Sequence, residues 1–498
     1  MTDNKPKDSW LDIIFGGGKK PTARPASLDL GLLRTAPDED WLGCIDFGTA
    51  FSKICVVRRH AAGETEPEDV HPLRLGPQAT AGGRSHFAPS TLYIVKDRIY
   101  FGAEALKVRN DQNDSDRDCF QSPKQVLSEM DDGALQTMPP ARQDPTQSFT
   151  RGELMTLLLA HLVWQAHTAA IRDERLNGLP RLRLARPAWR AEKVRRGEAQ
   201  LLKLFATAFA LAGTLKNQLT DAGGLPVAQA KAVLGLPRDD DELVNLISKR
   251  IEIGKDDADS IQRGFVLEAT AVAAAAIHPE QGKRRVLVVV DVGAGTTDYG
   301  AFVTTPGRGD GRIGELRRGQ HVALRAGNFI DEQVVALLKD KAGLTDGMPS
   351  SDPSIAHLKR RAAELKQSLF ETQRLTEELP NGQLVRTSLA ELLARPPVQD
   401  FAEDLREKFS ETFAVALEFI HNLNRDLRPE AIEVILTGGG SELPMVHALI
   451  DQARKSGAYP VKLVAGAPPW SRKTTWAPAF AQLAVAVGGA MPVMPQQR

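Results

Sequence analysis

Two strand–turn–strand patterns constrain the fold of this chain more than any other feature. CIDFGTAFSKI begins at residue 44, and VVDVGAGTTDYG begins at residue 289. Each has apolar residues, an aspartate, one apolar residue, a glycine, a nearby threonine and then a second apolar segment, which predicts a β-hairpin. A device that occurs twice predicts two similar α/β lobes that face each other across a cleft, with one turn from each lobe reaching toward the middle.

The chemistry of these turns favours a phosphate ligand and a cation. A glycine-rich turn lets backbone N–H groups approach phosphate oxygens, and the hydroxyls of Thr49 and Thr296 can add hydrogen bonds. Asp46 and Asp291 would repel phosphate unless a hard cation lies between them. Mg²⁺ keeps much of its water shell and is commonly held by one or two carboxylates together with phosphates. We therefore expect a magnesium-bound phosphate at these two turns.

Other interpretations of GAGTTD fit less well. In the dinucleotide fingerprint a third glycine stands where this chain has Asp298, and the segment opens a helix rather than a strand. The chain contains no GxxxxGK[ST] motif. A plain hairpin turn remains the alternative for either copy alone.

A third glycine turn occurs in ILTGGGSELPMV, from residue 435. Three glycines after a strand let a flat ligand or its sugar approach the backbone, and the N-terminus of the following helix favours an anion. Ser441 is a suitable N-cap, and Pro444 suits the first helical turn. A serine hydrolase elbow would need a glycine where Leu443 stands, so that interpretation is rejected.

Composition excludes several classes of protein. Lys plus Arg and Asp plus Glu number 63 each, so no field of one sign attracts nucleic acid. The three cysteines form no CxxC pair, which predicts a reduced, cytoplasmic protein. No apolar run predicts a transmembrane segment, and the start MTDNKPKDSW lacks the order of a signal peptide.

The remaining segments predict an organised α/β chain after a disordered tail at 1–40. Within that tail, residues 9–15 carry the apolar side chains of Trp10, Leu11, Ile13, Ile14 and Phe15 and could dock on a partner or a membrane surface. Extended segments are predicted at STLYIV and RIYFGAEA, and helices at 151–176 and 191–216. Either RLRLARPAW or AVLGLPRDDD supplies a further strand, and we favour the first. The other predicted segments are a polar insert at 217–262, a buried helix at FVLEATAVAAAAI, a helix-rich stretch at 328–425 and a strand at AIEVILT.

The order of these motifs resembles the ATPase superfamily of actin, sugar kinases and seventy-kilodalton heat-shock chaperones, over about residues 41–490. DnaK-type chaperones are the most similar, through PSTLYI with FGAEA, FQSPKQVL, FVLEATAVAAAA and RAGNFID. The resemblance implies an actin-like ATPase fold, with two lobes of duplicated ribonuclease-H-like α/β units around a nucleotide cleft. The implied division is lobe I at 41–281, lobe II at 282–465, and a return to lobe I at 466–498.

The same resemblance implies roles for individual residues. Asp46 and Asp291 would hold the water shell of Mg²⁺, and Lys124 would neutralise charge on the γ-phosphoryl group. Glu268, with Asp298 nearby, would orient the attacking water. The residues implied to bind the rest of ATP or ADP are Gly48, Thr49, Gly293, Gly295, Thr296, Gly327, Glu364, Lys366, Gly438, Gly439, Gly440 and Ser441.

The chain also departs from the family pattern. Ala269 replaces a proline beside Glu268, Ala294 replaces a glycine in the second turn, and Ala50 replaces a hydroxyl residue in the first. Either turn substitution could slow hydrolysis and leave binding intact. The sequence ends nine residues after Gly489, so we expect no C-terminal client-binding domain.

The function expected from these features is a chaperone-like switch that binds MgATP, hydrolyses it slowly and acts on a protein partner or client, with a cochaperone as a further possible partner. Three alternatives stay open at this point. They are a small-molecule kinase of the sugar kinase type, an actin-like filament protein and a nucleotide-binding scaffold that does not hydrolyse ATP.

Overall fold

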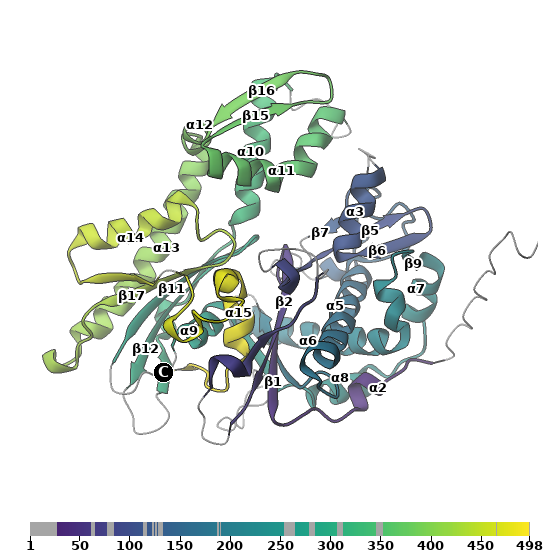
Figure 1. The fold of residues 1–498 in the computed structure, drawn as a ribbon, viewed down its shortest axis with the longest axis horizontal. Coiled ribbons are helices and arrows are strands. Elements are labelled where there is room, and N and C mark those ends of the chain that lie inside the picture. The colour runs from purple at the N-terminus through teal and green to yellow at the C-terminus, as the bar shows by residue number, and fades with distance from the viewer. Residues whose placement is uncertain are drawn as a thin grey trace, which may run out of the picture.

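The fold is built on two sheets with the same strand order (Figure 1). The computed structural model describes residues 27–60, 65–76, 84–112, 117–121, 124, 127, 133–186, 189, 191–252, 264–277, 284–305, 312–344, 352–464 and 466–497.

The first sheet has the order β10-β8-β1-β2-β3. β1 pairs antiparallel with β2, while β8 runs parallel to β1 and β10 runs parallel to β8. RLRLARPAW therefore supplies the strand β8, as favoured from the sequence. AVLGLPRDDD forms no strand, because its first three residues end one helix, its last two begin another and a turn lies between them. The bounds are β1 Trp41–Asp46, β2 Phe51–Arg58, β3 Val70–Pro72, β8 Arg181–Arg186 and β10 Phe265–Leu267, with β4 Ala88–Pro89 beside β2.

The second sheet repeats this arrangement in the order β18-β17-β11-β12-β13. β11 and β12 form the antiparallel hairpin, and β17 and β18 add in parallel on the other side of β11. The bounds are β11 Val286–Val292, β12 Thr297–Thr305, β13 Arg312–Glu315, β17 Ile432–Thr437 and β18 Val461–Val464, with β14 His321–Ala323 beside β12 and β19 Gln496–Gln497 beside β13. The two equivalent strand orders confirm the predicted duplicated α/β architecture.

Alternation along the central strands places each sheet between two layers of helices. Val288 and Val290 of β11 face an outer cluster, whereas Leu287 and Val289 face a central cluster shared by both sheets. The outer helices are α5 Arg151–Glu174 and α6 Ala191–Leu215 on the first sheet, and α13 Pro396–His421 and α14 Pro444–Ser456 on the second. Burial on both faces explains why β11 is apolar at every position except Asp291.

Two helices lie between the sheets, α9 Glu268–Ala276 and α15 Phe480–Ala490 (Figure 1). α9 packs on β11 and β12, and α15 packs on β1 and β2. The helices touch so closely that a Cβ at Gly488 would collide with the carbonyl oxygen of Ala271. The chain therefore crosses between the two lobes at both helices, and their contact joins the lobes at the base of the cleft.

Each lobe carries a smaller peripheral part (Figure 1). On the first lobe these elements are β5 Thr91–Val95, β6 Arg98–Phe101, β7 Phe120–Gln121, β9 Leu225–Pro226 and α3 Gly102–Gln112. On the second they are α10 Gly327–Ala342, α11 Pro353–Thr372, α12 Leu389–Leu393, β15 Arg374–Glu378 and β16 Leu384–Ser388. The extended segment predicted at RIYFGAEA ends at Phe101, because Gly102 has a positive φ of 57° and begins α3.

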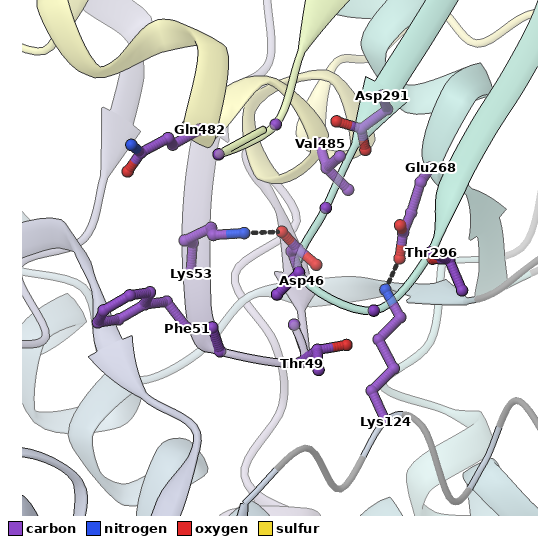
Figure 2. Close-up of a pocket in the computed structure, with 17 residues that line it drawn as sticks. Asp46, Thr49, Phe51, Lys53, Lys124, Glu268, Asp291, Thr296, Gln482 and Val485 are labelled. Atoms are coloured by element: carbon purple, nitrogen blue, oxygen red, sulfur yellow. Dashed lines mark hydrogen bonds and ion pairs between the residues drawn. The ribbon is translucent and has the colours of Figure 1, made fainter. Parts of the chain in front are cut away.

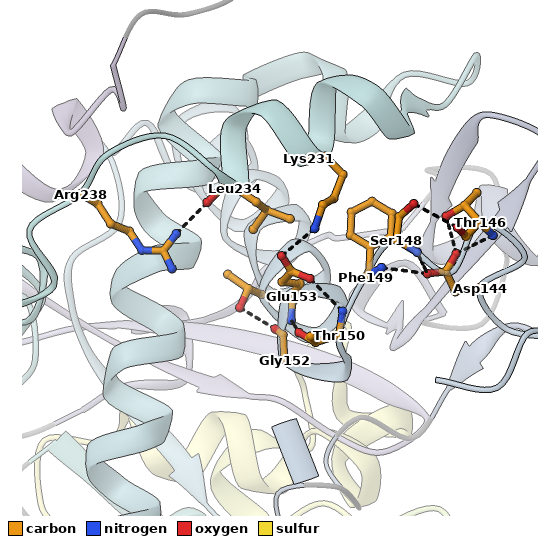
Figure 3. Close-up of polar contacts among 11 residues, drawn as sticks. Asp144, Thr146, Ser148, Phe149, Thr150, Gly152, Glu153, Lys231, Leu234 and Arg238 are labelled. Atoms are coloured by element: carbon orange, nitrogen blue, oxygen red, sulfur yellow. Dashed lines mark hydrogen bonds and ion pairs between the residues drawn. The ribbon is translucent and has the colours of Figure 1, made fainter. Parts of the chain in front are cut away.

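The insert at 217–262 is part of the first lobe in its described residues. Its helices α7 Val227–Leu234 and α8 Asp240–Ser248 pack on α6, and β9 pairs with β6. Figure 3 shows how α7 joins the start of α5: Lys231 Nζ lies 2.9 Å from Glu153 Oε1, and Glu153 also closes the capping box with Thr150. Nearby, Asp144 is fully buried and accepts hydrogen bonds from Thr146, Ser148 and Phe149.

The tail differs from its prediction near residue 30. Residues 27–40 pack against the first lobe through the short helix α2 Gly31–Arg34, in which Leu33 is buried. Asp29 lies 3.0 Å from Lys216 Nζ, and Leu28, Leu30 and Leu32 contact the apolar core. This part of the tail is ordered because its four leucines pack against the apolar core of the first lobe, and α2 contacts α6. The polar composition of the tail as a whole did not indicate this contact. The apolar motif at 9–15 lies outside the described residues.

One helix among the described residues, α5, is long and apolar enough to cross a membrane. In the fold, 72% of its most apolar window is buried inside the protein. The burial of α5 against α6 and the first sheet accounts for its composition as a core helix.

The remaining short helices are 3₁₀ turns at Pro67–Asp69, Arg84–His86, Ala134–Gln136, Lys216–Thr220, Arg317–Gly319, Arg425–Leu427, Pro469–Ser471 and Ala477–Ala479.

Candidate functional site

A cavity lies where the two hairpin turns meet (Figure 2). Its walls come from both central hairpins, from the start of α9, from the turn after β17 and from α15. The lining residues are Asp46, Gly48, Thr49, Ala50, Phe51, Lys53, Lys124, Glu268, Asp291, Gly293, Ala294, Gly295, Thr296, Gly438, Gly439, Gln482 and Val485.

The first turn places a carboxylate beside an ammonium group. Asp46 ends β1 and is buried, and its cross-strand partner on β2 is Lys53. Residues directly opposite in an antiparallel pair share one face of the sheet. Lys53 Nζ lies 2.7 Å from Asp46 Oδ2, as Figure 2 shows. The first carboxylate is therefore neutralised by its own hairpin.

The second turn places two carboxylates opposite each other. The cross-strand partner of Asp291 is Asp298, and both side chains are buried. Thr437 donates a hydrogen bond of 3.0 Å to Asp291 Oδ1, and Thr296 donates one of 3.0 Å to Asp298 Oδ2. Burial, followed by repulsion from Asp298, raises the pKa of Asp291 to about 6. The second turn thus places two buried carboxylates close together.

The two turns come into contact across the cleft. A Cβ at Gly295 would lie 2.9 Å from Thr49 Oγ1, so the glycine permits the close approach of the second turn to the first. This contact brings together the two threonines that the sequence predicted as phosphate ligands, since both Thr49 and Thr296 line the cavity.

Lys124 and Glu268 form an ion pair at the edge of the cavity (Figure 2). Both side chains are buried, and Glu268 is the first residue of α9, where a negative charge is favoured by the helix dipole. Burial lowers the pKa of the Lys124 ammonium, an effect opposed by the nearby carboxylates of Asp46 and Asp298. The pair therefore brings the predicted phosphate-neutralising lysine and the predicted water-orienting glutamate into one place.

The third turn crosses directly over the end of β11. Gly438 has a φ of 84° and leaves no room for a Cβ against the carbonyl oxygen of Val292. Gly440 N donates a hydrogen bond of 2.9 Å to that same oxygen, and Gly438 N donates one of 2.8 Å to Ala481 O of α15. Gly439 has open space beside it and lines the cavity together with Gly438.

The N-cap predicted at Ser441 is wrong. α14 begins at Pro444, and its N-cap is Leu443, which makes no side-chain cap. Ser441 is buried in the turn, and its backbone N–H donates to Gly438 O at 3.3 Å. The proline at the first helical position fixes the start of the helix later than the serine suggested.

Six predicted site residues do not line the cavity: Asp298, Gly327, Glu364, Lys366, Gly440 and Ser441. Gly327 supports the second turn, because its N–H donates to Gly293 O at 3.1 Å. Lys366 Nζ donates to Gly327 O at 3.2 Å and lies 2.9 Å from Asp331 Oδ1. Glu364 is 73% exposed at its side chain and pairs with Arg361. Their assignment to the nucleotide stays a prediction.

Four further residues line the cavity and were not predicted from the sequence: Phe51, Lys53, Gln482 and Val485. The hairpin register offered a signal for Lys53, because it places this residue directly opposite Asp46. Gln482 and Val485 lie on α15, far along the chain, and no local motif marks them.

The donor set fits a cation that brings most of its own ligands. Among the described residues, no group of three or more His, Cys, Asp or Glu side chains could hold a metal ion alone. Asp46 and Asp291 each have one carboxylate oxygen engaged, by Lys53 and Thr437 respectively. One further oxygen of each remains for water molecules of a hydrated Mg²⁺, whose other ligands are phosphates and water.

The family comparison agrees with this geometry. Residues 262–460 match the HSP70 family, described as Hsp70 protein. The match includes α9, the second hairpin and the third glycine turn, whereas the first hairpin and Lys124 lie before it. A search of curated proteins gave no match. Across the matched residues the chain is of the Hsp70 type, and its two equivalent sheets form the actin-like ATPase fold of that family, which supports a chaperone-like, nucleotide-binding function.

Proposed function

We propose that the protein binds MgATP between its two hairpin turns, hydrolyses it slowly and changes its affinity for a protein partner with the state of the nucleotide. The observation that carries this proposal is the meeting of both Asp-x-Gly turns, the Lys124–Glu268 pair and Gly439 around one cavity. Each of these features occurs in other settings, but together they supply what phosphoryl transfer to water requires.

The backbone and hydroxyl groups of the turns bind the phosphates in this proposal. Thr49 and Thr296 donate hydrogen bonds, and the turn glycines leave the backbone N–H groups accessible. Asp46 and Asp291 would hold Mg²⁺ through water, and the ion would neutralise phosphate charge in the loose transition state.

Lys124 and Glu268 divide their roles when a nucleotide binds. Lys124 exchanges Glu268 for the γ-phosphoryl oxygens, which releases the carboxylate to orient the attacking water. In the protein without nucleotide, the ion pair between Lys124 and Glu268 allows both charged groups to be buried, because each neutralises the other.

The switch relies on the contact between α9 and α15. Each helix packs on a different sheet, and the two meet at Gly488 and Ala271. A change in phosphate state that moves one turn relative to the other rotates the lobes about this contact. The partner, a client or a cochaperone in the family's manner, must bind the two nucleotide states with different affinity.

We place this activity in the cytoplasm. The three cysteines are free and buried in the structure, as expected where thiols stay reduced.

A non-hydrolysing scaffold is the second candidate function. Ala50 and Ala294 both line the cavity at positions where the family carries other residues, and neither offers a hydroxyl or the freedom of glycine. A scaffold of this kind would bind ATP without hydrolysing it.

Phosphate release from ATP by the wild-type protein, Asp291→Ala and Lys124→Ala separates the two functions. We expect slow release in the wild type and a loss of about 100-fold in both variants, since each removes a charge that the transition state needs. If the wild type binds nucleotide but releases phosphate no faster than the two variants, the result would support the scaffold instead. A capture experiment from lysate in ATP and in ADP, with Asp291→Ala as control, then tests the switch. A partner retained equally in both states would contradict it.

A further inference from the structure

Lys53 has no counterpart in the second hairpin. It lies directly opposite Asp46 in the β1–β2 register, and the equivalent position opposite Asp291 is occupied by Asp298. The side chain of Lys53 is 17% exposed, lines the cavity and holds Asp46 at 2.7 Å. A lysine opposite the strand-end aspartate is therefore present in the first hairpin and not in the second.

The charges around the cavity make such a cation consequential. The carboxylates of Asp46, Glu268, Asp291 and Asp298 face the ammonium groups of Lys53 and Lys124. When all are ionised, the acids outnumber the lysines by two. A polyphosphate that arrives without a cation is therefore repelled, and removal of Lys53 makes this repulsion stronger.

Lys53 is also positioned to leave Asp46. Its ammonium lies 3.5 Å from where a Cβ of Gly48 would be, so it lies over the first turn, whose N–H groups are predicted to bind phosphate. A lysine has a flexible stem and a compact charge, and it exchanges one anionic partner for another without strict geometry.

We propose that Lys53 is a resident cation of the phosphate site: it neutralises Asp46 when no nucleotide is bound and turns to the phosphates when one is. Lys53 and Mg²⁺ then share the task of neutralising the phosphates and Asp46. Nucleotide binding should consequently depend less on Mg²⁺ than in a site whose only nearby cation is Lys124. This inference rests on the proposed nucleotide site.

Calorimetric titration with ADP, in Mg²⁺ and in EDTA, measures this dependence. The quantity compared is the ratio of the dissociation constant in EDTA to that in Mg²⁺. We expect the ratio to rise about tenfold in Lys53→Met, because Mg²⁺ must then supply all of the compensation near Asp46. Lys53→Arg keeps the charge and should keep the wild-type ratio.

Lys231→Met is the matched control, since Lys231 is also an ion-paired lysine of the first lobe but contacts Glu153 away from the cavity (Figure 3). It loses the same charge and should leave the ratio unchanged. Adenosine provides a second control, because a ligand without phosphate should bind Lys53→Met and the wild type equally. A merely structural effect of Lys53 would weaken adenosine as well.

The outcomes are distinct. No binding of ADP to the wild type under either condition would overturn the nucleotide site itself. Wild-type binding with the same ratio in Lys53→Met would overturn the role of Lys53 and leave the site intact. Lys53→Gln retains a hydrogen-bond donor for Asp46 without the charge, and it gives the same comparison if Lys53→Met does not fold.

Discussion

The two central hairpins share a backbone but differ in charge. In the β1–β2 hairpin, Asp46 stands opposite Lys53, whereas in the β11–β12 hairpin, Asp291 stands opposite Asp298. The first pair attracts and the second repels. Duplicated topology has therefore produced two turns with different electrostatic tasks.

The two turns therefore differ in how they bind a ligand. The first turn is neutral as folded, so it is ready to accept phosphate oxygens. The second holds two buried carboxylates, and the pKa of Asp291 is raised to about 6 as a result. An incoming cation gains most from the second turn, where two buried carboxylates stand opposite each other.

The largest effect is expected when the first turn is made to resemble the second. Lys53→Asp places a carboxylate opposite Asp46 and should weaken MgADP binding by about 100-fold, with an unfolding free energy lower by about 3 kcal/mol, because two buried like charges face each other. Calorimetry and urea unfolding measure the two effects. If Lys53→Asp binds MgADP within threefold of the wild type, the charge of the first turn has no role. Lys231→Asp is the control, because it reverses the charge of a lysine away from the cavity.

The next effect contrasts the two aspartates in the unliganded protein. The folded pKa of Asp291 lies above its unfolded value, so protonation favours the folded state and stability falls as pH rises from about 4 through about 6. At about pH 8, Asp291→Asn should raise the unfolding free energy by about 2 kcal/mol, since it removes the buried charge. Asp46→Asn should lower it, since Lys53 loses its partner.

Urea unfolding at about pH 8 and about pH 4.5 checks both variants. The gain from Asp291→Asn should shrink at the lower pH, where wild-type Asp291 is largely protonated in the folded state. Equal loss of stability in both variants at the higher pH would mean that the two turns do not differ as described.

A smaller effect is expected from Asp298→Asn. This variant removes the like charge opposite Asp291 and should stabilise the unliganded protein by about 1 kcal/mol, while the pKa of Asp291 falls. The pH below which MgADP binding is lost should then be lower in Asp298→Asn than in the wild type. If this pH is the same in both proteins, burial alone raises the pKa of Asp291.

The smallest effect concerns the contact between the turns. A methyl group at Gly295 would press on the flexible Thr49 side chain, so Gly295→Ala should weaken MgADP binding by about threefold. Thr49→Ser in the same chain removes the methyl group 3.3 Å from the new Cβ, so the hydroxyl at 2.9 Å can rotate away, and part of the lost affinity should be recovered. No recovery would indicate that the turns do not meet at this contact.

The parts of the fold and site that could be predicted are those with a local pattern. The hairpins around Asp46 and Asp291 follow from apolar strands and glycine turns, and the strand β17 with its triple glycine follows in the same way. The same pattern also contained Lys53, because the register of a short hairpin fixes which residues face each other.

Other features depend on contacts between distant segments. Gln482 reaches the cavity only because α15 crosses between the sheets. Glu364 and Lys366 lie on one turn of α11, and no periodicity indicates which of them points to Gly327. Residues 27–40 are ordered because they pack against the first lobe, and composition alone does not reveal that contact.

The most direct test of the account is calorimetric titration of MgADP into the wild type, Asp46→Asn and Asp291→Asn. We expect one nucleotide site per chain and a loss of affinity of about tenfold or more in each variant, since both turns bind the same phosphates. No heat of binding in the wild type, or a loss in only one of the two variants, would contradict a site shared by both hairpins.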